Sequence, residues 1–500
     1  MSTVLDLLER TAGNYPDLIA VTSPQQSSQV TWSELRGRAR HWGAGLAAQG
    51  VAPGDRVAIV LGNTLEFPIA LFAVLYAGGV AVPVNSRLTP TEAAGILAHS
   101  EVKLAICNRE TRPLADASVP VLEPQGLDQE QPAALPPGPA GTDDAEIIYT
   151  SGTTGQPKGV VMTHAAVVET AAMAAYEFGM RPRDRVAVLM PVTHSAPLNL
   201  FLVGATYTGS TVVLDTFNPR DCAAMLALLE REAAQYLFAA PVAYLLALGA
   251  DPSRYNLSAM KCWVYGGAPM STAQVQTVRG AFGGRWMGVY GLTESGPNGI
   301  ALADEDHDLH AGSLGWHPTV NTEVRLVDGE GRDVPAGTPG ELIMRTPSAM
   351  RAYFKNPEAT SAVLRDGWIY TGDMARRDGD GYYWMLDRKK DLILSGGYNV
   401  YPREVEDAVL THPAVLDVAV VATPHPEWGE TVAAVVVLQP GRALSLEQLR
   451  DHLRPLLASQ KHPRRLEVVT ALPRNATGKL LREEVRRTLA SAPPTAQPGS

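Results

Sequence analysis

Cysteine is scarce in this chain: only Cys107, Cys222 and Cys262 occur among 500 residues, and no two of them form a CxxC pair. The sequence therefore shows neither the ligand spacing of a structural zinc site nor a framework of disulfide bonds. It also lacks the basic start and apolar stretch that a secretory signal peptide has at its N-terminus. Both absences favour a reducing, cytoplasmic location.

The chain also has no excess of positive charge, because 42 Lys and Arg face 52 Asp and Glu, for a formal net charge of -10 at pH 7. Binding to nucleic acid or to an anionic membrane surface needs a basic patch. The balance argues against both kinds of partner. It still allows a small local site for a phosphorylated ligand.

Uninterrupted apolar runs of membrane-spanning length are missing as well. The segment 67–84 comes closest, but four helix-breaking residues interrupt it, namely Pro68, Gly78, Gly79 and Pro83. A transmembrane helix needs about 20 consecutive apolar residues. A buried helix at about 67–77, a glycine turn and a buried strand at about 80–84 explain the segment better.

Short apolar runs alternate with helix-period stretches through the first half of the chain. The runs cover residues 56–63, 103–107, 146–150, 185–190 and 211–215. Alternation of this kind predicts an α/β architecture of parallel sheets covered by helices. A chain of 500 residues is too long for one core, so at least two domains are expected.

After about residue 320 the turns become dense, which favours a small antiparallel or barrel-like β unit. The segment 387–399 then combines a charge cluster with Gly396 and Gly397, a composition suited to a hinge, and an α+β unit follows it. We therefore expect a large N-terminal domain of two helix-covered sheets plus the β unit (1–389), a small mobile C-terminal α+β domain (390–490) and a disordered tail (491–500).

The strongest local signal is YTSGTTGQPKG, residues 149–159, which follows a predicted strand and precedes a predicted helix. Glycines and small hydroxylated residues let the backbone approach phosphate oxygens, and a lysine adds positive charge. Pro157 and Gly159 stand where a Walker A loop needs Gly and Ser or Thr. The segment is therefore a phosphate loop of another kind.

This loop resembles the signature of the adenylate-forming (AMP-binding) superfamily, which includes acyl- and aryl-CoA synthetases, adenylation domains of peptide synthetases and beetle luciferases. Four more of the family's motifs follow in its order: YGLTES (290–295), YTGDMA (370–375), DRKKDLILSGGYNVYPREVE (387–406) and PRNATGKLLR (473–482). The resemblance spans nearly the whole chain. It implies an AMP-forming acid–thiol ligase that uses ATP, Mg²⁺ and coenzyme A.

Site residues follow from the resemblance, position by position. Those that hold the nucleotide are Thr150, Ser151, Gly152, Thr153, Thr154, Gly155, Lys158, Gly267, Ala268, Pro269, Tyr290, Gly291, Asp373 and Arg388. Tyr290 is expected to stack on adenine, and Thr293 to meet the phosphate. Thr154 and Glu294 are expected to bind Mg²⁺, because a carboxylate beside a triphosphate needs a cation between them. Asp373 has two oxygens that match the two ribose hydroxyls.

The C-terminal motifs are assigned in the same way. Lys479 resembles the catalytic lysine of adenylation, which stabilises negative charge between carboxylate and phosphate. Lys390 matches the hinge about which the family rotates its small domain. The residues that match the pantetheine tunnel are Ser395, Gly396, Gly397 and Tyr398. Trp428 and the basic excess of segment 461–487 are candidates for the CoA nucleotide, although Gln460 and His462 depart from the family's usual residues there.

The acyl pocket is expected beside residues 191–201, 238–244, 264–270 and 290–300, which are dominated by small or apolar residues. Residues 189–203 contain no acid, whereas amino-acid-activating relatives place an aspartate here. His194 matches an aromatic or histidine gate. An apolar, bulky carboxylic acid without an α-amino group is the expected substrate.

Other interpretations stay open at this stage. The thiol acceptor is either CoA or the phosphopantetheine arm of a separate carrier protein. A luciferase-like oxygenase shares the motifs, and a catalytically silent binding protein would not need Lys158, Glu294, Asp373 and Lys479 intact. The sequence leaves the oligomeric state undecided, a homodimer included.

Overall fold

The computed structural model describes residues 2–115, 119–129, 134–150, 157–268, 270–395, 398–426, 428–474 and 480–491. The chain divides into two compact units: unit 1 is Met1–Val324 with Ile343–Tyr370, and unit 2 is Arg325–Leu342 with Thr371–Ser500. Among the described residues, no helix has the length and apolarity needed to cross a membrane. The boundary between residues 389 and 390 stays a prediction.

Unit 1 contains a nine-stranded sheet with strand order β15-β14-β13-β12-β11-β9-β10-β1-β2. Its strands are β1 (Ile19–Ser23), β2 (Ser28–Thr31), β9 (Arg185–Val188), β10 (Thr211–Leu214), β11 (Tyr236–Ala239), β12 (Cys262–Gly266), β13 (Trp286–Gly291), β14 (Gly299–Leu302) and β15 (His317–Pro318). The strands from β1 to β13 pair in parallel, and antiparallel strands close both edges.

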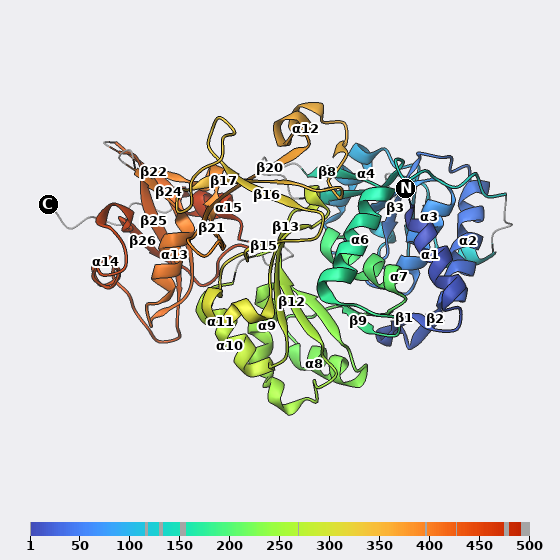
Figure 1. Ribbon diagram of the computed structural model, residues 1–500, viewed down its shortest axis with the longest axis horizontal. Coiled ribbons are helices and arrows are strands. Elements are labelled where there is room, and N and C mark those ends of the chain that lie inside the picture. Colours follow the sequence, from blue (N-terminus) through green and yellow to red (C-terminus); the bar gives the residue numbers. More distant parts are fainter. Residues whose placement is uncertain are drawn as a thin grey trace. The chain divides into compact units, whose positions relative to one another are not determined.

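Helices cover this sheet because its apolar strands must be buried on both faces. Helices α8 (Cys222–Arg231), α9 (Pro241–Ala247) and α10 (Thr272–Phe282) lie beside β12 in Figure 1. Buried aromatic rings fill this part of the core: Trp263 stacks on Trp286 with ring centroids 5.8 Å apart, and Tyr244 meets both edge-on.

The second sheet of unit 1 has seven strands in the order β18-β8-β7-β4-β3-β5-β6. They are β3 (Arg56–Val60), β4 (Val80–Pro83), β5 (Leu104–Cys107), β6 (Val121–Leu122), β7 (Asp144–Thr150), β8 (Lys158–Thr163) and β18 (Ala352–Tyr353). Helix α3 (Glu66–Tyr76) is buried from Phe67 to Tyr76. The predicted buried helix, turn and strand at 67–84 are therefore confirmed, as are the predicted parallel sheets.

The remaining helices of unit 1 complete its layers. They are α1 (Val4–Asn14), α2 (Trp32–Ala48), α4 (Pro90–Ser100), α5 (Pro124–Gln129), α6 (His164–Phe178), α7 (Gly204–Thr208), α11 (His307–His310) and α12 (Pro357–Val363). A π-helix occupies Ala196–Val203, immediately before α7. Such i→i+5 turns are rare and are frequent at functional sites.

A third sheet contains β16 (Glu323–Val327), β17 (Gly340–Arg345), β20 (Trp368–Arg377) and β19 (Leu364–Arg365) in that order, with β21 (Tyr383–Arg388) on β20. The division between the two units falls within β16, β17 and β20. The dense turns predicted after residue 320 separate these strands.

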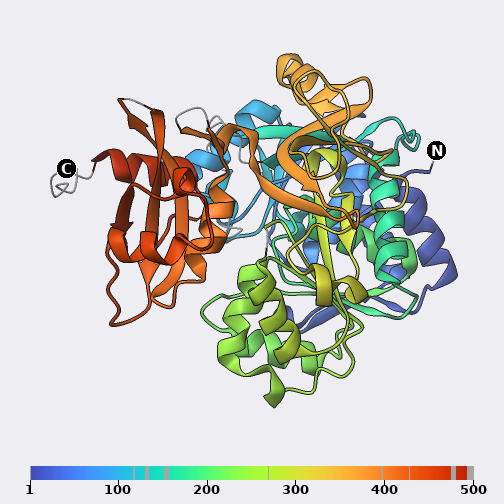
Figure 2. The ribbon, with the colours of Figure 1, turned by 60° about the vertical axis from the view of Figure 1, so that its left-hand side comes forward.

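The C-terminal part of unit 2 is the α+β fold that the sequence predicts. Its sheet has the order β23-β22-β25-β24, with β26 on β25. The strands are β22 (Ile393–Ser395), β23 (Tyr398–Val400), β24 (Val415–His425), β25 (Gly429–Leu438) and β26 (Arg465–Val468). Figure 2 shows them in orange and red with helices on their faces.

Alternating side chains of β24 bury both faces of this sheet. Val418 and Val420 join a core with α13 (Pro402–Leu410) and α14 (Leu446–Leu453). Ala419 and Val421 face the opposite way and join a core with α15 (Arg482–Ser491). The period of two along a strand thus places the three helices on two faces.

Candidate active site

The phosphate loop connects two antiparallel strands. β7 ends at Thr150 and β8 begins at Lys158, and these two residues are register partners. Residues Ser151, Gly152, Thr153, Thr154 and Gly155 lie outside the described residues. The helix predicted after the loop is confirmed as α6, which begins at His164, with β8 between the loop and the helix. The apolar run after the loop pairs with β7 as a strand before the helix starts.

Steric crowding explains why a glycine occupies position 159, where the chain leaves this loop. A Cβ atom there would lie 2.8 Å from Ile147 Cγ2 and 3.1 Å from Tyr149 Cζ. The contact of 2.8 Å is closer than real Cβ atoms come, so the side chains of Ile147 and Tyr149 would have to shift to admit a larger residue. The glycine thus leaves room for these two side chains of β7 against β8.

Several of the predicted nucleotide-binding residues meet at the carboxyl ends of two neighbouring parallel strands. β12 ends at Gly266 and β13 at Gly291, with Gly266 opposite Val289. Gly267 and Ala268 follow β12, and Tyr290 and Gly291 end β13; Pro269 lies outside the described residues. Ligands of open α/β sheets bind at this edge. The structure therefore brings these candidates together.

Thr293 and Glu294 lie in the 3₁₀ turn Thr293–Ser295, directly after β13. Ser295 holds the turn, because its buried hydroxyl donates to Asn298 O (2.6 Å) and accepts from Leu292 N (3.0 Å). Thr293 and Glu294 are half-buried. Rigid support from Ser295 leaves both side chains available to a ligand at the edge of the sheet.

Glu294 and Lys158 approach the same aromatic side chain. Tyr353 Oη donates to Glu294 Oε1 at 2.6 Å, and Lys158 Nζ lies 4.9 Å from the centre of the Tyr353 ring. Within the described part of the chain, no carboxylate lies within ion-pairing distance of Lys158. Its charge is therefore available to an anionic ligand.

A magnesium ion fits these groups as part of a nucleotide complex. No cluster of three or more His, Cys, Asp or Glu able to hold a metal occurs among the described residues. Mg²⁺ commonly takes one or two carboxylates and completes its shell with phosphate oxygens and water. Glu294 Oε2, which has no hydrogen-bond partner in the described residues, is suited to that role.

In unit 2, the structure brings the two predicted ribose residues together. Asp373 in β20 and Arg388 in β21 are register partners, and Arg388 Nε lies 2.6 Å from Asp373 Oδ1. The Asp373 side chain is only 3% exposed, whereas that of Arg388 is 31% exposed. Arg388 also donates to Thr371 O at 3.3 Å. Its guanidinium is thus held by the carboxylate rather than extended into solvent.

The hinge and tunnel candidates follow along the chain. Lys390 is exposed in the three-residue turn Lys389–Asp391 between β21 and β22. Ser395 ends β22 and is the register partner of Tyr398, which is 58% exposed. Gly396, Gly397 and Lys479 lie outside the described residues.

The basic excess of segment 461–487, a candidate receptor for CoA phosphates, is largely paired with carboxylates. Carboxylates pair with most of its described cations: Lys461 with Glu404, Arg474 with Asp417, Arg482 with Glu406, and Arg486 with Asp391. Arg464 differs, because its guanidinium lies 3.5 Å from the ring centre of Trp428. Trp428 also stacks on His425 at 4.8 Å.

His194 lies at the start of the π-helix, with its Nε2 atom buried and without a hydrogen-bond partner in the described residues. Burial lowers the pKa of His194 to about 4, so the imidazole is neutral at pH 7. Residues Pro197–Val203 after it are buried and uncharged. This segment is therefore buried and uncharged, with the polar groups of Thr193, Ser195 and Asn199 beside that of His194.

Two supporting residues escaped the sequence interpretation. Asn63 holds the segment before His194, because its Oδ1 accepts from Val192 N (2.9 Å) and its Nδ2 donates to Met190 O (3.0 Å). Glu146 is buried in β7 and accepts a 2.6 Å hydrogen bond from Asn199 of the π-helix. The sequence could have indicated Glu146, because it is an acid in the apolar run EIIYT. No local pattern marks Asn63 as a supporting residue.

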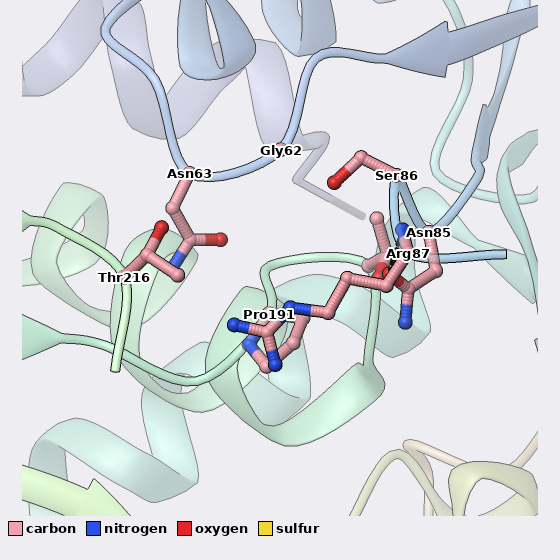
Figure 3. Close-up of a pocket in the computed structure, with 8 residues that line it drawn as sticks. Gly62, Asn63, Asn85, Ser86, Arg87, Pro191 and Thr216 are labelled. Carbon is pink, nitrogen blue, oxygen red and sulfur yellow. Dashed lines mark hydrogen bonds between the residues drawn. The ribbon is translucent and has the colours of Figure 1, made fainter. Parts of the chain in front are cut away.

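A small cavity lies beside Asn63. Figure 3 shows Asn63 and Thr216 on one side of it and Asn85, Ser86 and Arg87 on the other. Its volume is about 20 Å³, which is room for about one water molecule. It is therefore too small to hold an acyl chain.

Comparisons with known proteins agree with this geometry. The model of the AMP-binding enzyme family matches residues 8–354, and that of the AMP-binding enzyme C-terminal domain matches residues 404–479. The chain is 36% identical to a feruloyl-CoA synthase of Amycolatopsis sp, covering 95% of this chain and 98% of the relative. It is 34% identical to the fatty acid–[acyl-carrier-protein] ligase ScoC of Streptomyces coeruleorubidus, covering 91% of each.

Among solved structures, o-succinylbenzoate coenzyme A synthetase (MenE) from Bacillus subtilis, in complex with ATP and magnesium ion, superposes with a TM-score of 0.86. It is 29% identical, and the match covers 96% of this chain and 98% of that one. The matched family models and relatives extend over nearly the whole sequence. The chain therefore belongs to the AMP-binding, adenylate-forming enzyme family and is an AMP-forming acid–thiol ligase of its CoA-synthetase branch.

Proposed function

We propose that this ligase joins an apolar carboxylic acid without an α-amino group to coenzyme A in two steps. The carboxylate first attacks the α-phosphate of ATP, forming acyl-adenylate and releasing pyrophosphate. The thiol of CoA then attacks the acyl carbon, forming the thioester and releasing AMP. ATP, Mg²⁺ and coenzyme A are its cofactors, as the sequence predicts.

The observation that carries the substrate class is the buried, uncharged segment of His194 and the π-helix Ala196–Val203, which we take as one wall of the acyl pocket. An ammonium group there would be buried without a counter-ion, which is costly. Glu146, the acid in contact with the π-helix, does not supply a permanent charge, because burial raises its pKa to about 7. The wall therefore favours acids with apolar bodies.

The residues assigned from the motifs divide the work of the first step. Lys158 and Thr293 bind phosphate oxygens, and Asp373 with Arg388 holds the ribose. Glu294 would hold the magnesium ion, which when bound would neutralise charge on the leaving pyrophosphate. Lys479 supplies positive charge between carboxylate and α-phosphate, where two anions would otherwise repel each other.

The second step uses a changed pose of the C-terminal domain, 390–490, about Lys390. Lys390 suits a hinge because it is exposed, whereas the next residue, Asp391, is buried and pairs with Arg486. CoA would reach the adenylate along Ser395 to Tyr398. Trp428 and the guanidinium of Arg464 offer a stacking and charged surface to its nucleotide.

A second candidate acceptor is the phosphopantetheine arm of a separate carrier protein. The likeness to a fatty acid–[acyl-carrier-protein] ligase supports it. A reaction with this acceptor has the same first step and differs only in the molecule that carries the thiol. The neutralised cations of segment 461–487 also leave fewer charges for CoA phosphates.

The test is incubation with ATP, Mg²⁺ and a library of carboxylic acids, with CoA or a phosphopantetheinylated carrier protein, analysed by mass spectrometry. We expect acyl-CoA from apolar acids and poor turnover of free α-amino acids. Acyl-adenylate that forms but transfers only to the carrier would select the second candidate. Amino acids as the best substrates would contradict the proposed pocket.

A further inference from the structure

A short backbone strap links the turn that bears Glu294 to the strand that leaves the phosphate loop. Met350 N donates to Glu294 O at 2.8 Å, and Phe354 N donates to Gly159 O at 2.7 Å. Between them, Tyr353 in β18 is the register partner of Val160 in β8. Two sequence-distant parts of the site are thus tied through residues 350–354.

The side chain of Tyr353 makes the same connection. It is only 5% exposed. Its hydroxyl donates to Glu294 Oε1 at 2.6 Å, and its ring centre lies 4.9 Å from Lys158 Nζ. A hydrogen bond to a carboxylate is stronger than one to a neutral group. A cation over an aromatic face is attracted without being neutralised.

The backbone of Tyr353 is itself held in place. Its N–H donates to Thr360 Oγ1 at 3.0 Å, and its carbonyl accepts from Asn356 N at 3.1 Å. Asn356 Oδ1 caps α12 by accepting from Ala359 N at 2.9 Å. The tyrosine therefore stands on a turn that the helix stabilises, and its hydroxyl has a defined position.

We propose that Tyr353 is a positioning residue of the nucleotide site, and the proposal rests on the proposed role of Glu294. The hydroxyl holds one oxygen of Glu294, so that the other oxygen is presented to the magnesium ion of Mg·ATP. The ring holds the ammonium of Lys158 beside the same phosphates. Without the hydroxyl, the carboxylate would have to be ordered by the metal itself, and Mg·ATP would bind more weakly.

The test compares Tyr353→Phe with Tyr236→Phe by calorimetry of ATP binding, once with Mg²⁺ and once with a chelator and no metal. Tyr236 is a matched control, because it is also buried. Its hydroxyl donates at 3.2 Å to the carboxylate of Asp184, which is 52 residues away in the sequence. We expect Tyr353→Phe to raise the Kd of Mg·ATP by about tenfold. The Kd of ATP without metal should change less than about twofold, and Tyr236→Phe should change neither.

A double-variant cycle tests whether the hydroxyl of Tyr353 acts through the carboxylate of Glu294. In a Glu294→Gln background, Tyr353→Phe should have no further effect on Mg·ATP, because the group that it positions is gone. Equal losses with and without metal, or additive losses in the cycle, would overturn the inference.

Failure of the proposed function itself would look different. If Glu294→Gln leaves the dependence of ATP binding on Mg²⁺ unchanged, Glu294 does not bind the metal. If Glu294→Gln abolishes that dependence and Tyr353→Phe does not alter it, only the role of Tyr353 is wrong. Thermal unfolding of each variant, followed by circular dichroism, checks that it is folded.

Discussion

Two positive side chains, one in each unit, have different surroundings. In unit 2, the side chain of Arg482 is only 16% exposed and pairs with the carboxylates of Glu406 and Asp387. In unit 1, Lys158 lies over the ring of Tyr353, and the described residues offer it no carboxylate. Both cations belong to family motifs, yet only one is left for a ligand.

The partners of each cation distinguish structural charges from functional ones. A buried cation must be matched by carboxylates, because removing it from water is costly. Once matched, it has little attraction left for a phosphate. A lysine on an aromatic face keeps its full charge. The number of basic residues in a segment therefore predicts a phosphate site less well than the partners of each one.

The largest effect is expected when the cation that is paired with carboxylates, Arg482, is removed. Arg482→Met leaves Glu406 and Asp387 without their buried partner, so the free energy of unfolding of unit 2 should fall by about 3–5 kcal/mol. Urea unfolding monitored by hydrogen exchange in β24 would measure it. Arg454→Met is the control, since Arg454 forms an exposed pair with Asp451 and its loss should cost less than about 1 kcal/mol. A similar loss in both variants would contradict the interpretation.

Removing the unmatched cation should affect chemistry instead of stability. We expect Lys158→Met to slow acid-dependent pyrophosphate release by about 100-fold, the scale for losing one preorganised charge at a developing anion, with an unchanged thermal midpoint. Lys355→Met is the control, because Lys355 also lies over an aromatic ring, that of Phe354 at 5.4 Å, but pairs with Glu101. It should retain activity within about twofold. Equal loss in both would mean that pairing does not decide function.

The comparison extends to a carboxyl group that no cation of the described residues matches. Burial raises the pKa of Glu146 from 4.5 to about 7. The folded protein therefore holds this proton more tightly than the unfolded chain, and the resulting stability is lost as pH rises from about 4.5 through 7. Glu146→Gln does not titrate, so its thermal midpoint should rise relative to that of the parent by roughly 2–4 °C between pH 5 and pH 8. A pH-independent difference would show that Glu146 is not buried as an acid.

The smallest effect is expected within the basic segment itself. Arg464 has an aromatic ring and no carboxylate in the described residues, whereas Lys461 contacts both oxygens of Glu404. Arg464→Ala should raise the KM for CoA by about fivefold, and Lys461→Ala by less than about twofold. Steady-state kinetics with CoA as the varied substrate would check the pair. The reverse order would make Lys461 the phosphate contact.

Much of this fold follows from short-range patterns. The apolar runs at 56–63 and 103–107 contain the buried strands β3 and β5, because a strand in a parallel sheet is covered on both faces. The interruptions in 67–84 correctly predict the helix, turn and strand there. The secondary structure of the apolar run after the phosphate loop is harder to predict, because a short apolar run is compatible with a strand or a helix. In the structure it forms β8, which pairs with β7.

The family, its motifs and their order can be read from the sequence, since each motif is a contiguous stretch whose chemistry is local. Which charged groups are free depends on the fold. Glu404, Glu406 and Asp391 lie 57, 76 and 95 residues from the cations that they neutralise, and Glu294 lies 59 residues from the tyrosine that holds it. Electrostatic interactions depend on distance and on burial, and both are set by the packing of segments that are remote in the chain.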